Sequence, residues 1–255
     1  MRGESPMLVL GIDTSGAPGS VSLCRGWAGG FEVIACTALR ARTFSAQLVP
    51  EIAGLLERNK LSARDIDGYA VVSGPGSFTG LRVGLAAVKG LAEILQKPIA
   101  AISMLEVMAE CASASRASTA STCSEQSRMH AVLDGSRGEF FVGSYVRIGN
   151  QLHREERLAD YEELLNIAGT EPVIICESSV EEALRASGKS LQMIARPDSG
   201  AVARTGMQKI RDGEIVSAEG LLANYLRDAD VKVQPRRNEP GAPASASPAN
   251  TKWKT

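Results

Sequence analysis

A glycine-rich run in the first third of the chain could hold an anion. It reads S-G-P-G-S-F-T-G-L-R-V-G over residues 73–84 and joins a predicted strand to a long apolar helix. Glycine permits positive φ angles and close contact with a neighbouring segment, and proline fixes one φ. Ser77 or Thr79 can cap the helix, whose first free amides could bind an anion or a partner carboxylate. The candidate residues of this glycine loop are Gly74, Pro75, Gly76, Ser77, Phe78, Thr79 and Arg82.

The spacing of the glycines restricts this chemistry. Gly74, Gly76 and Gly80 give G-x-G-x-x-x-G, which is neither the dinucleotide-binding fingerprint nor a P-loop, since Gly-Lys-Ser/Thr is absent. Phe78 is bulky among small residues and suggests a packed, shaped turn. A tight strand-to-helix turn without a ligand explains these residues as well as an anion site does.

Two acidic turns could serve a nucleotide and Mg²⁺ if they face one cleft. The first is Asp13-Thr14-Ser15 and the second begins at Asp134. Carboxylates position magnesium and water, and hydroxyls and turn amides hold phosphate. In the alternative interpretation, Asp13 closes an Asx turn and Asp134 ends a strand, each satisfying local amides.

Composition limits the function classes. The 255 residues, 44% of them hydrophobic, can form one large domain or two small lobes. The net charge of −1, from 28 basic and 29 acidic side chains, leaves direct nucleic-acid contact to a local patch or a partner. Five cysteines without a C-x-x-C pair indicate reduced, mostly buried thiols. No run resembles a signal sequence or a membrane span, so we expect a cytoplasmic protein without membrane contact.

The histidines argue against a metal enzyme. His130 and His153 are the only two, they lie far apart in the sequence, and H-E-x-x-H is absent. A metallopeptidase is therefore disfavoured, and no metal site is expected. His153 alternates with charged residues in a predicted edge strand, which favours a solvated side chain.

The predicted elements alternate between strands and helices. In the first part we expect strands at 7–12, 20–24, 31–39 and 68–72 and helices at 45–60 and 81–96. A helix at 104–111 should be followed by a frayed end and mobile loop over 112–127. The second part predicts a strand at 129–133, a hairpin at 139–157, and strands at 173–176 and 191–194, with helices at 161–168, 180–186 and 199–212.

Two helices carry stripes that could meet a partner. Small residues at Gly80, Gly84 and Ala87, followed by Gly90 or Leu91, recur on one side of the helix after the glycine loop. The helix before it has Leu48, Ile52 and Leu55 on one face. On the residues alone, burial in the protein's own core explains these stripes as well as an interface does.

Four segments, in order, resemble the bacterial TsaB family. The glycine loop from Gly74 to Gly84 is similar to the family's signature. The others are 8–15 with 20–23, then Asp134 with Arg137-Gly138-Glu139, and finally Tyr225-Leu226-Arg227. The segments span residues 8–227, which makes the resemblance specific although each piece outside the glycine loop is short.

This resemblance implies an α/β protein of the actin/Hsp70/sugar-kinase-like (ASKHA) fold, with two related lobes that each have a mixed sheet and flanking helices. The first lobe would be 7–103, rejoined by 216–231, and the second, smaller lobe 104–215. The tail at 234–255, rich in Pro, Ala and Ser, should be disordered.

The resemblance also implies a noncatalytic subunit for threonylcarbamoylation of the adenosine beside the tRNA anticodon. Such a protein binds and activates a TsaD-like catalytic subunit, with a TsaE-like ATPase at the joint surface, a TsaC-type enzyme supplying the intermediate, and tRNA reached only indirectly. The partner-interface candidates are Leu48, Ile52, Leu55, Gly80, Gly84, Ala87 and Leu91. A homodimer of the protein alone stays open.

The alternative is an independent ATPase or kinase of the same fold. Nucleotide sites of this fold usually have a glycine pair after a second-lobe strand, where this chain has Cys176-Glu177-Ser178-Ser179. Asp13, Thr14, Ser15 and Asp134 would then line a vestigial cleft, with no cofactor expected and at most weak binding of ATP or ADP.

Three residues depart from the family's pattern. Phe44 stands where His is frequent, Ser136 where Arg is frequent, and Ala223 where Pro usually precedes Tyr-Leu-Arg. The first two put in doubt any polar contact inherited at those positions. Phe44 could instead add apolar area to the first-lobe surface.

Overall fold

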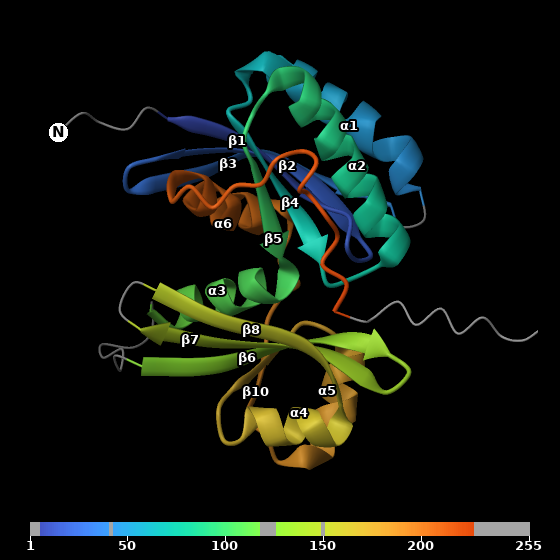
Figure 1. Cartoon of the computed structure of the whole chain (residues 1–255), viewed down its shortest axis with the longest axis vertical. Coiled ribbons are helices and arrows are strands. Elements are labelled where there is room, and N and C mark those ends of the chain that lie inside the picture. The colour runs from blue at the N-terminus through green and yellow to red at the C-terminus, as the bar shows by residue number, and fades with distance from the viewer. Residues whose placement is uncertain (1–5, 41–42, 118–125, 149–150, 227–255) are drawn as a thin grey trace, which may run out of the picture.

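Two five-stranded sheets with the same strand order form the protein, with helices around and between them (Figure 1). The structure, a computed structural model, describes residues 6–40, 43–117, 126–148 and 151–226. The first sheet comes from the N-terminal part of the chain and the second from the part after residue 125.

The first sheet has the order β3-β2-β1-β4-β5. Strands β1, β2 and β3 are antiparallel neighbours, whereas β1, β4 and β5 run parallel. β1 and β4 are apolar runs buried along nearly their whole length, as expected for strands covered on both faces. The bounds are β1 (Met7–Asp13), β2 (Gly19–Trp27), β3 (Gly30–Leu39), β4 (Gly68–Gly74) and β5 (Ile99–Ser103).

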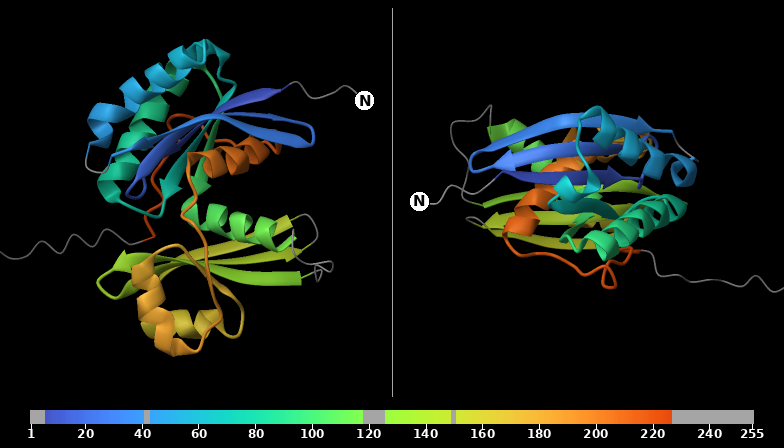
Figure 2. Two further views of the ribbon diagram at one scale, coloured as in Figure 1. Left: turned by 180° about the vertical axis from the view of Figure 1, so that it is seen from behind. Right: turned by 90° about the horizontal axis from the view of Figure 1, so that it is seen from above.

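Helices cover both faces of this sheet (Figure 2). α1 (Phe44–Arg58) and α2 (Phe78–Leu95) pack on one face, and the short η1 (Ala63–Asp65) links α1 to β4. α6 (Ser199–Arg211) packs on the other face. Successive residues of β1 point to opposite faces of the sheet, so Ile12 faces α2 while Gly11 lies under α6.

The second sheet repeats the first. In the same direction its strand order is β8-β7-β6-β9-β10, so β6 takes the central place of β1. Strands β6, β7 and β8 are antiparallel neighbours, and β6, β9 and β10 are parallel. This repeated half-unit confirms the predicted ASKHA fold class. The bounds are β6 (Gln126–Ser136), β7 (Glu139–Ile148), β8 (Gln151–Asp160), α4 (Tyr161–Ala168), β9 (Val173–Ile175), α5 (Ser178–Leu184), η2 (Arg185–Ser187) and β10 (Leu191–Met193).

The space between the sheets is filled by α3 (Met104–Ala117) and α6 (Figure 1). Their buried side chains join residues of both sheets in one apolar cluster, from Val9 and Ala70 on the first to Leu133 and Tyr145 on the second. The sheets therefore share an inner core, while α4 and α5 cover the outer face of the second sheet.

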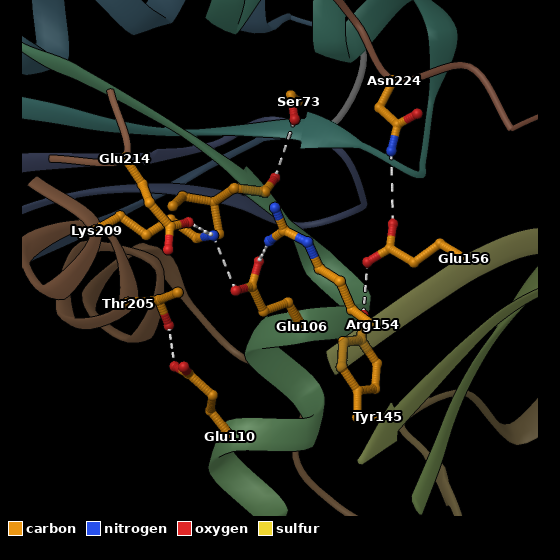
Figure 3. Close-up of polar contacts among 11 residues, drawn as sticks. Ser73, Glu106, Glu110, Tyr145, Arg154, Glu156, Thr205, Lys209, Glu214 and Asn224 are labelled. Carbon is orange, nitrogen blue, oxygen red and sulfur yellow. Dashed lines mark hydrogen bonds and ion pairs between the residues drawn. The ribbon is translucent and has the colours of Figure 1, made fainter. Parts of the chain in front are cut away.

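A polar network crosses this inner core (Figure 3). The buried Glu106 of α3 forms ion pairs with Lys209 of α6, at 3.0 Å, and with Arg154 of β8, at 2.9 Å. The hydroxyl of Thr205 in α6 donates to Glu110 of α3. The hydroxyl of Tyr145, whose pKa burial raises well above its ordinary value, donates to Glu156 at 2.6 Å. These contacts fix the two sheets relative to each other.

The structure differs from the sequence expectations in several places, one of which is β5, a strand absent from the predicted elements. α3 continues to Ala117, so the frayed end expected from residue 112 is wrong up to that point, and β6 begins at Gln126; residues 118–125 lie outside the described part. α6 packs on the first sheet although the expected division placed it with the second lobe. Cys36 is exposed, and of the four described cysteines only Cys24 is buried.

The division into lobes stays a prediction. The expected tail at 234–255 and residues 227–231 lie outside the described residues. Within the described ranges, no helix has the length and apolar character needed to cross a membrane.

Candidate functional site

The glycine loop is a sharp turn from β4 into α2. Gly74 and Gly76 have φ angles of 153° and 154°, which side-chain-bearing residues rarely adopt. Ser77, one of the two cap candidates, is the N-cap, and its hydroxyl accepts from the Gly80 N–H at 3.3 Å. Phe78 begins α2 and is half exposed instead of packed inside the turn.

This loop packs directly on the first acidic turn. The Ser77 N–H donates to the Ser15 carbonyl at 2.7 Å, and the Thr14 hydroxyl donates to the Gly80 carbonyl at 2.8 Å. A Cβ at Gly76 would collide with the Ser15 backbone, and one at Gly80 with the Thr14 backbone. The glycines are thus explained by close contact between two segments of the same chain.

The small-residue stripe of α2 therefore faces inward. Gly84 is buried, and a Cβ there would lie 2.5 Å from the Thr14 hydroxyl oxygen. The prediction of Gly80 and Gly84 as surface residues for a partner is wrong for this reason. Ala87 and Leu91 are partly buried.

The C-terminal segment closes over the other side of the loop. The Asn224 N–H donates to the Ser73 carbonyl at 2.8 Å. Next to it, the Tyr225 ring lies 5.1 Å from the Phe78 ring, centroid to centroid, and its hydroxyl accepts from Arg82 Nε at 3.2 Å. The Arg82 guanidinium carbon also lies 3.7 Å from the Phe78 ring centroid. Three segments that predicted the family thus meet at the start of α2; Arg227 lies outside the described residues.

Both acidic turns satisfy their own amides. Asp13, which is 1% exposed, accepts from the Ser15 N–H at 2.8 Å and from the Ser15 hydroxyl at 2.6 Å. Asp134 accepts from the Ser136 N–H at 2.7 Å. These are the bonds of the Asx interpretation. Burial raises the pKa of Asp13, although the nearby Arg196 and the bonds from Ser15 act in the opposite direction.

Arg196 links the two acidic turns. It precedes α6, and its Nη2 donates to the Ser15 hydroxyl at 3.2 Å while its Nη1 donates to Glu177 Oε1 at 3.3 Å. Glu177 Oε2 in turn accepts from the Asp134 N–H at 2.8 Å. A Cβ at Gly16 would collide with the Arg196 guanidinium. A protein cation therefore lies where the sequence suggested nucleotide phosphate and Mg²⁺.

The sequence did not single out Arg196, because a lone arginine between a short strand and a helix belongs to no recognised pattern. The only signal was its position two residues before Asp198, the N-cap of α6, which accepts from the Gly200 and Ala201 N–H groups. Among the residues that the structure describes, no three histidine, cysteine or carboxylate side chains come together as a metal site.

An apolar groove runs between α1 and α2, with a volume of about 440 Å³. Val49 is 61% exposed on one side, and Phe78 at the N-terminal end of α2 is 51% exposed. Leu48 lies at the groove, but Leu48, Ile52 and Leu55 are buried in the core between α1 and the first sheet. Their prediction as surface residues is wrong, because this stripe is the core-facing side of an amphipathic helix. The groove residues are Ser45, Leu48, Val49, Phe78, Thr79, Arg82, Val83, Ala86 and Ala87.

Phe44 also lies inside the molecule. It is 8% exposed and packs in the core beside Gly19, where a Cβ would meet its ring at 2.9 Å. The expectation that Phe44 enlarges the apolar surface is therefore wrong. Ser136 has a φ of 64° in the turn from β6 to β7, and Ala223 is partly buried.

Comparisons with known proteins find the TsaD family model and TsaB relatives. The family model described as TsaD, tRNA N6-adenosine threonylcarbamoyltransferase, matches residues 38–229. The Escherichia coli tRNA threonylcarbamoyladenosine biosynthesis protein TsaB is 31% identical over 223 residues, covering 85% of this chain and 84% of the relative. The Bacillus subtilis protein of the same name is 28% identical over 243 residues, covering 89% and 97%.

A solved structure shares the fold. It is a Pseudomonas aeruginosa protein described as uncharacterized, with similarity to peptidase YeaZ, and it superposes with a TM-score of 0.70 at 24% identity. The superposition covers 87% of this chain and all of that one. The likeness therefore extends over both sheets.

Proposed function

Since the chain belongs to the TsaB family, we propose that it is the noncatalytic subunit that activates a TsaD-like threonylcarbamoyltransferase. TsaB homologues take part in the biosynthesis of threonylcarbamoyladenosine in tRNA, and this chain takes part in the same biosynthesis as a member of the family. The catalytic chemistry would then belong to the partner, with a TsaE-like ATPase and a TsaC-type enzyme in the same reaction sequence.

One observation supports the noncatalytic role above the others. The Arg196 guanidinium lies between the acidic turns. It donates to Ser15, which follows β1 of the first sheet, and to Glu177, which follows β9 of the second sheet. A nucleotide in this cleft would have to displace a partly buried ion pair whose carboxylate also accepts from the backbone of Asp134. If the guanidinium turned to a phosphate instead, Glu177 would lose its ion pair beside a second anion, which is unfavourable. We therefore expect at most weak ATP or ADP binding.

We propose the α1–α2 groove as the docking face for the TsaD-like partner. Large exposed apolar side chains gather there, and such grooves commonly accept an apolar helix face. Val49 and Phe78 are the strongest candidates for direct contact, with Ala87 on the adjoining turn. This replaces the inward-facing residues predicted from the sequence while keeping the same two helices.

The test is threonylcarbamoylation of tRNA by purified TsaD-, TsaE- and TsaC-type proteins, with this chain present or omitted. We expect modification to require the chain, which alone neither modifies tRNA nor hydrolyses ATP. Equal modification without the chain would refute the proposed role. ATP hydrolysis by the chain alone would instead support an independent ATPase.

The docking face has its own prediction. Val49→Asp should weaken the affinity for the TsaD-like partner by about tenfold or more, because it places a charge in an apolar contact. Met193→Asp, a control at a 46%-exposed position on β10 of the second sheet, should leave that affinity unchanged. Titration calorimetry measures both, and circular dichroism checks the fold. Equal affinities for the two variants would exclude the groove.

A further inference from the structure

A second pocket lies on the outer face of the second sheet and has no part in the proposed function. Its volume is about 370 Å³, and its walls come from β6, β7 and β8 with the edge of α4. In the register, His130 lies opposite Ser144 and Val146 opposite His153, so alternate residues of three strands share this face. Figure 1 shows these strands extending past α4, which leaves this part of the sheet uncovered by that helix.

Two arginine side chains face the pocket. Arg128 and Arg157 line it together with the single carboxylate of Glu155. Arg154 also borders the pocket, but its side chain leaves the sheet on the inner face, where it pairs with Glu106 at 2.9 Å. Arg157 lies 3.8 Å from Glu155, but both side chains are more than half exposed, so this pair is weak. Arg128 is exposed and makes no ion pair within the described part of the chain.

Neutral hydrogen-bonding groups complete the pocket. His130 is 2% exposed, its Nδ1 lies 3.0 Å from the Ser144 hydroxyl oxygen, and its Nε2 has no hydrogen-bond partner among the described residues. Buried polar atoms normally have partners, so an unpaired one beside a pocket indicates a missing contact. Burial lowers the pKa of His130, which keeps the imidazole neutral near pH 7.

We propose that this pocket binds a phosphate group, and that the phosphate belongs to the backbone of an RNA. Guanidinium groups match phosphate oxygens in geometry and charge, and the hydroxyl of Ser144 adds a neutral donor. The chain as a whole has a net charge of −1, so this local excess of arginine is the kind of patch that direct nucleic-acid contact requires.

The positions of the arginines fit the phosphates of an RNA strand better than a free phosphate ion. Arg128 and Arg157 are exposed and stand on different strands, β6 and β8, so they can contact successive phosphates of one strand. This part of the inference rests on the proposed function, in which the substrate is tRNA. It departs from the sequence expectation that tRNA is reached only through a partner.

The histidines provide a specific probe. The sequence contains two, and both line this pocket, so ring resonances of histidine-labelled protein report on it directly. His153→Gln assigns the two signals. An anticodon stem-loop RNA, ADP and inorganic phosphate are then titrated separately at constant ionic strength. We expect the RNA to move both signals saturably at concentrations where phosphate does not.

Two charge-matched variants separate the pocket from general charge attraction. Arg128→Gln with Arg157→Gln should weaken RNA binding by about tenfold or more. Arg25→Gln with Arg64→Gln removes the same charge from exposed positions on the first sheet side and should change the affinity by less than about twofold. Equal weakening by both pairs would overturn the site.

Each of the other titration outcomes rejects a specific part of the proposal. If none of the three probes moves the signals, the pocket is not a phosphate site. If ADP or phosphate binds and RNA does not, the phosphate site stands and its RNA source is wrong. These titrations need no partner, so they can fail while the proposed function holds. In the complete reaction, the Arg128/Arg157 variant should raise KM for tRNA with kcat and partner affinity unchanged, whereas failure of the proposed function would appear as no stimulation by the wild-type chain.

Discussion

At the scale of single residues, the contact between the two acidic turns depends on one cation and one buried acid. Arg196 bonds to Ser15 and Glu177, and Asp13 is held by Ser15 from the other side. The same Ser15 hydroxyl therefore serves both charged groups. Both hydrogen bonds from Ser15 reach the same oxygen of the Asp13 carboxylate, Oδ1, so local groups occupy one side of this buried carboxylate.

The buried Asp13 carboxyl predicts a pH dependence of stability. Burial raises its pKa in the folded protein above the ordinary 3.8, so the unfolded chain loses this proton at lower pH than the folded one. The stability that Asp13 contributes is complete below pH 3.8 and is lost as the pH rises through the folded value. Asp13→Asn does not ionise, and its amide oxygen can still accept from Ser15.

The measurement compares urea unfolding of wild type and Asp13→Asn at about pH 4 and pH 7. The free energy of unfolding of the variant, relative to wild type, should be higher at pH 7 than at pH 4. A shift in the opposite direction would mean that Arg196 holds Asp13 ionised with a lowered pKa.

At the scale of elements, α2 shows how far a sequence pattern can be interpreted. Its amphipathic spacing predicts the helix, because that signal is local, although α2 begins at Phe78, three residues before the predicted start at Leu81. The direction of its glycine stripe is not local. Small residues permit close approach of any segment, and here that segment is the Asp13–Ser15 turn, which lies more than sixty positions earlier. Only the tertiary contact distinguishes a core stripe from an interface stripe.

Two glycines of α2 provide a matched test of this packing. Gly84→Ala should destabilise the fold by about 1–3 kcal/mol, since its Cβ would lie 2.5 Å from the Thr14 hydroxyl oxygen. Gly90→Ala is the control, because a Cβ there meets nothing within 4 Å. It should stabilise by about 0.5–1 kcal/mol through helix propensity alone. Urea unfolding gives both values. A Gly84→Ala variant as stable as the wild type would mean that the glycine stripe does not pack closely on the Asp13–Ser15 turn.

At the scale of the whole molecule, the fold was predictable to a large extent and the site only in part. Hydrophobic runs and turns gave nearly all strands, and the order of four short segments indicated two related halves. The contacts between the halves were not predictable, because Arg196, Glu106 and Lys209 belong to no motif and meet only when α3 and α6 pack between the sheets. Polar groups that lie far apart in the sequence thus define both the contact between the acidic turns and the polar network of the inner core.

Glu106 is the residue through which the two sheets can be tested as one unit. Glu106→Gln removes the carboxylate from Lys209, whose side chain is 9% exposed, and from Arg154, which is 48% exposed. Arg154 can turn to water, and Lys209 keeps Glu214 at 3.2 Å. We therefore expect a loss of about 2–3 kcal/mol, somewhat below that for breaking a fully buried pair. Glu51→Gln, which breaks the exposed pair with Arg58, should cost about 0.5 kcal/mol or less.

Hydrogen exchange at increasing urea reveals whether this loss is shared by both sheets. In the wild type, amides of β4 and β6 should open at the same urea concentration, because α3 and its ion pairs connect their cores. In Glu106→Gln the two openings should separate, since the ion pairs that join α3 to α6 and β8 are lost while each sheet keeps its own apolar core. Simultaneous opening in the variant would assign the coupling to the shared apolar cluster instead of the ion pairs.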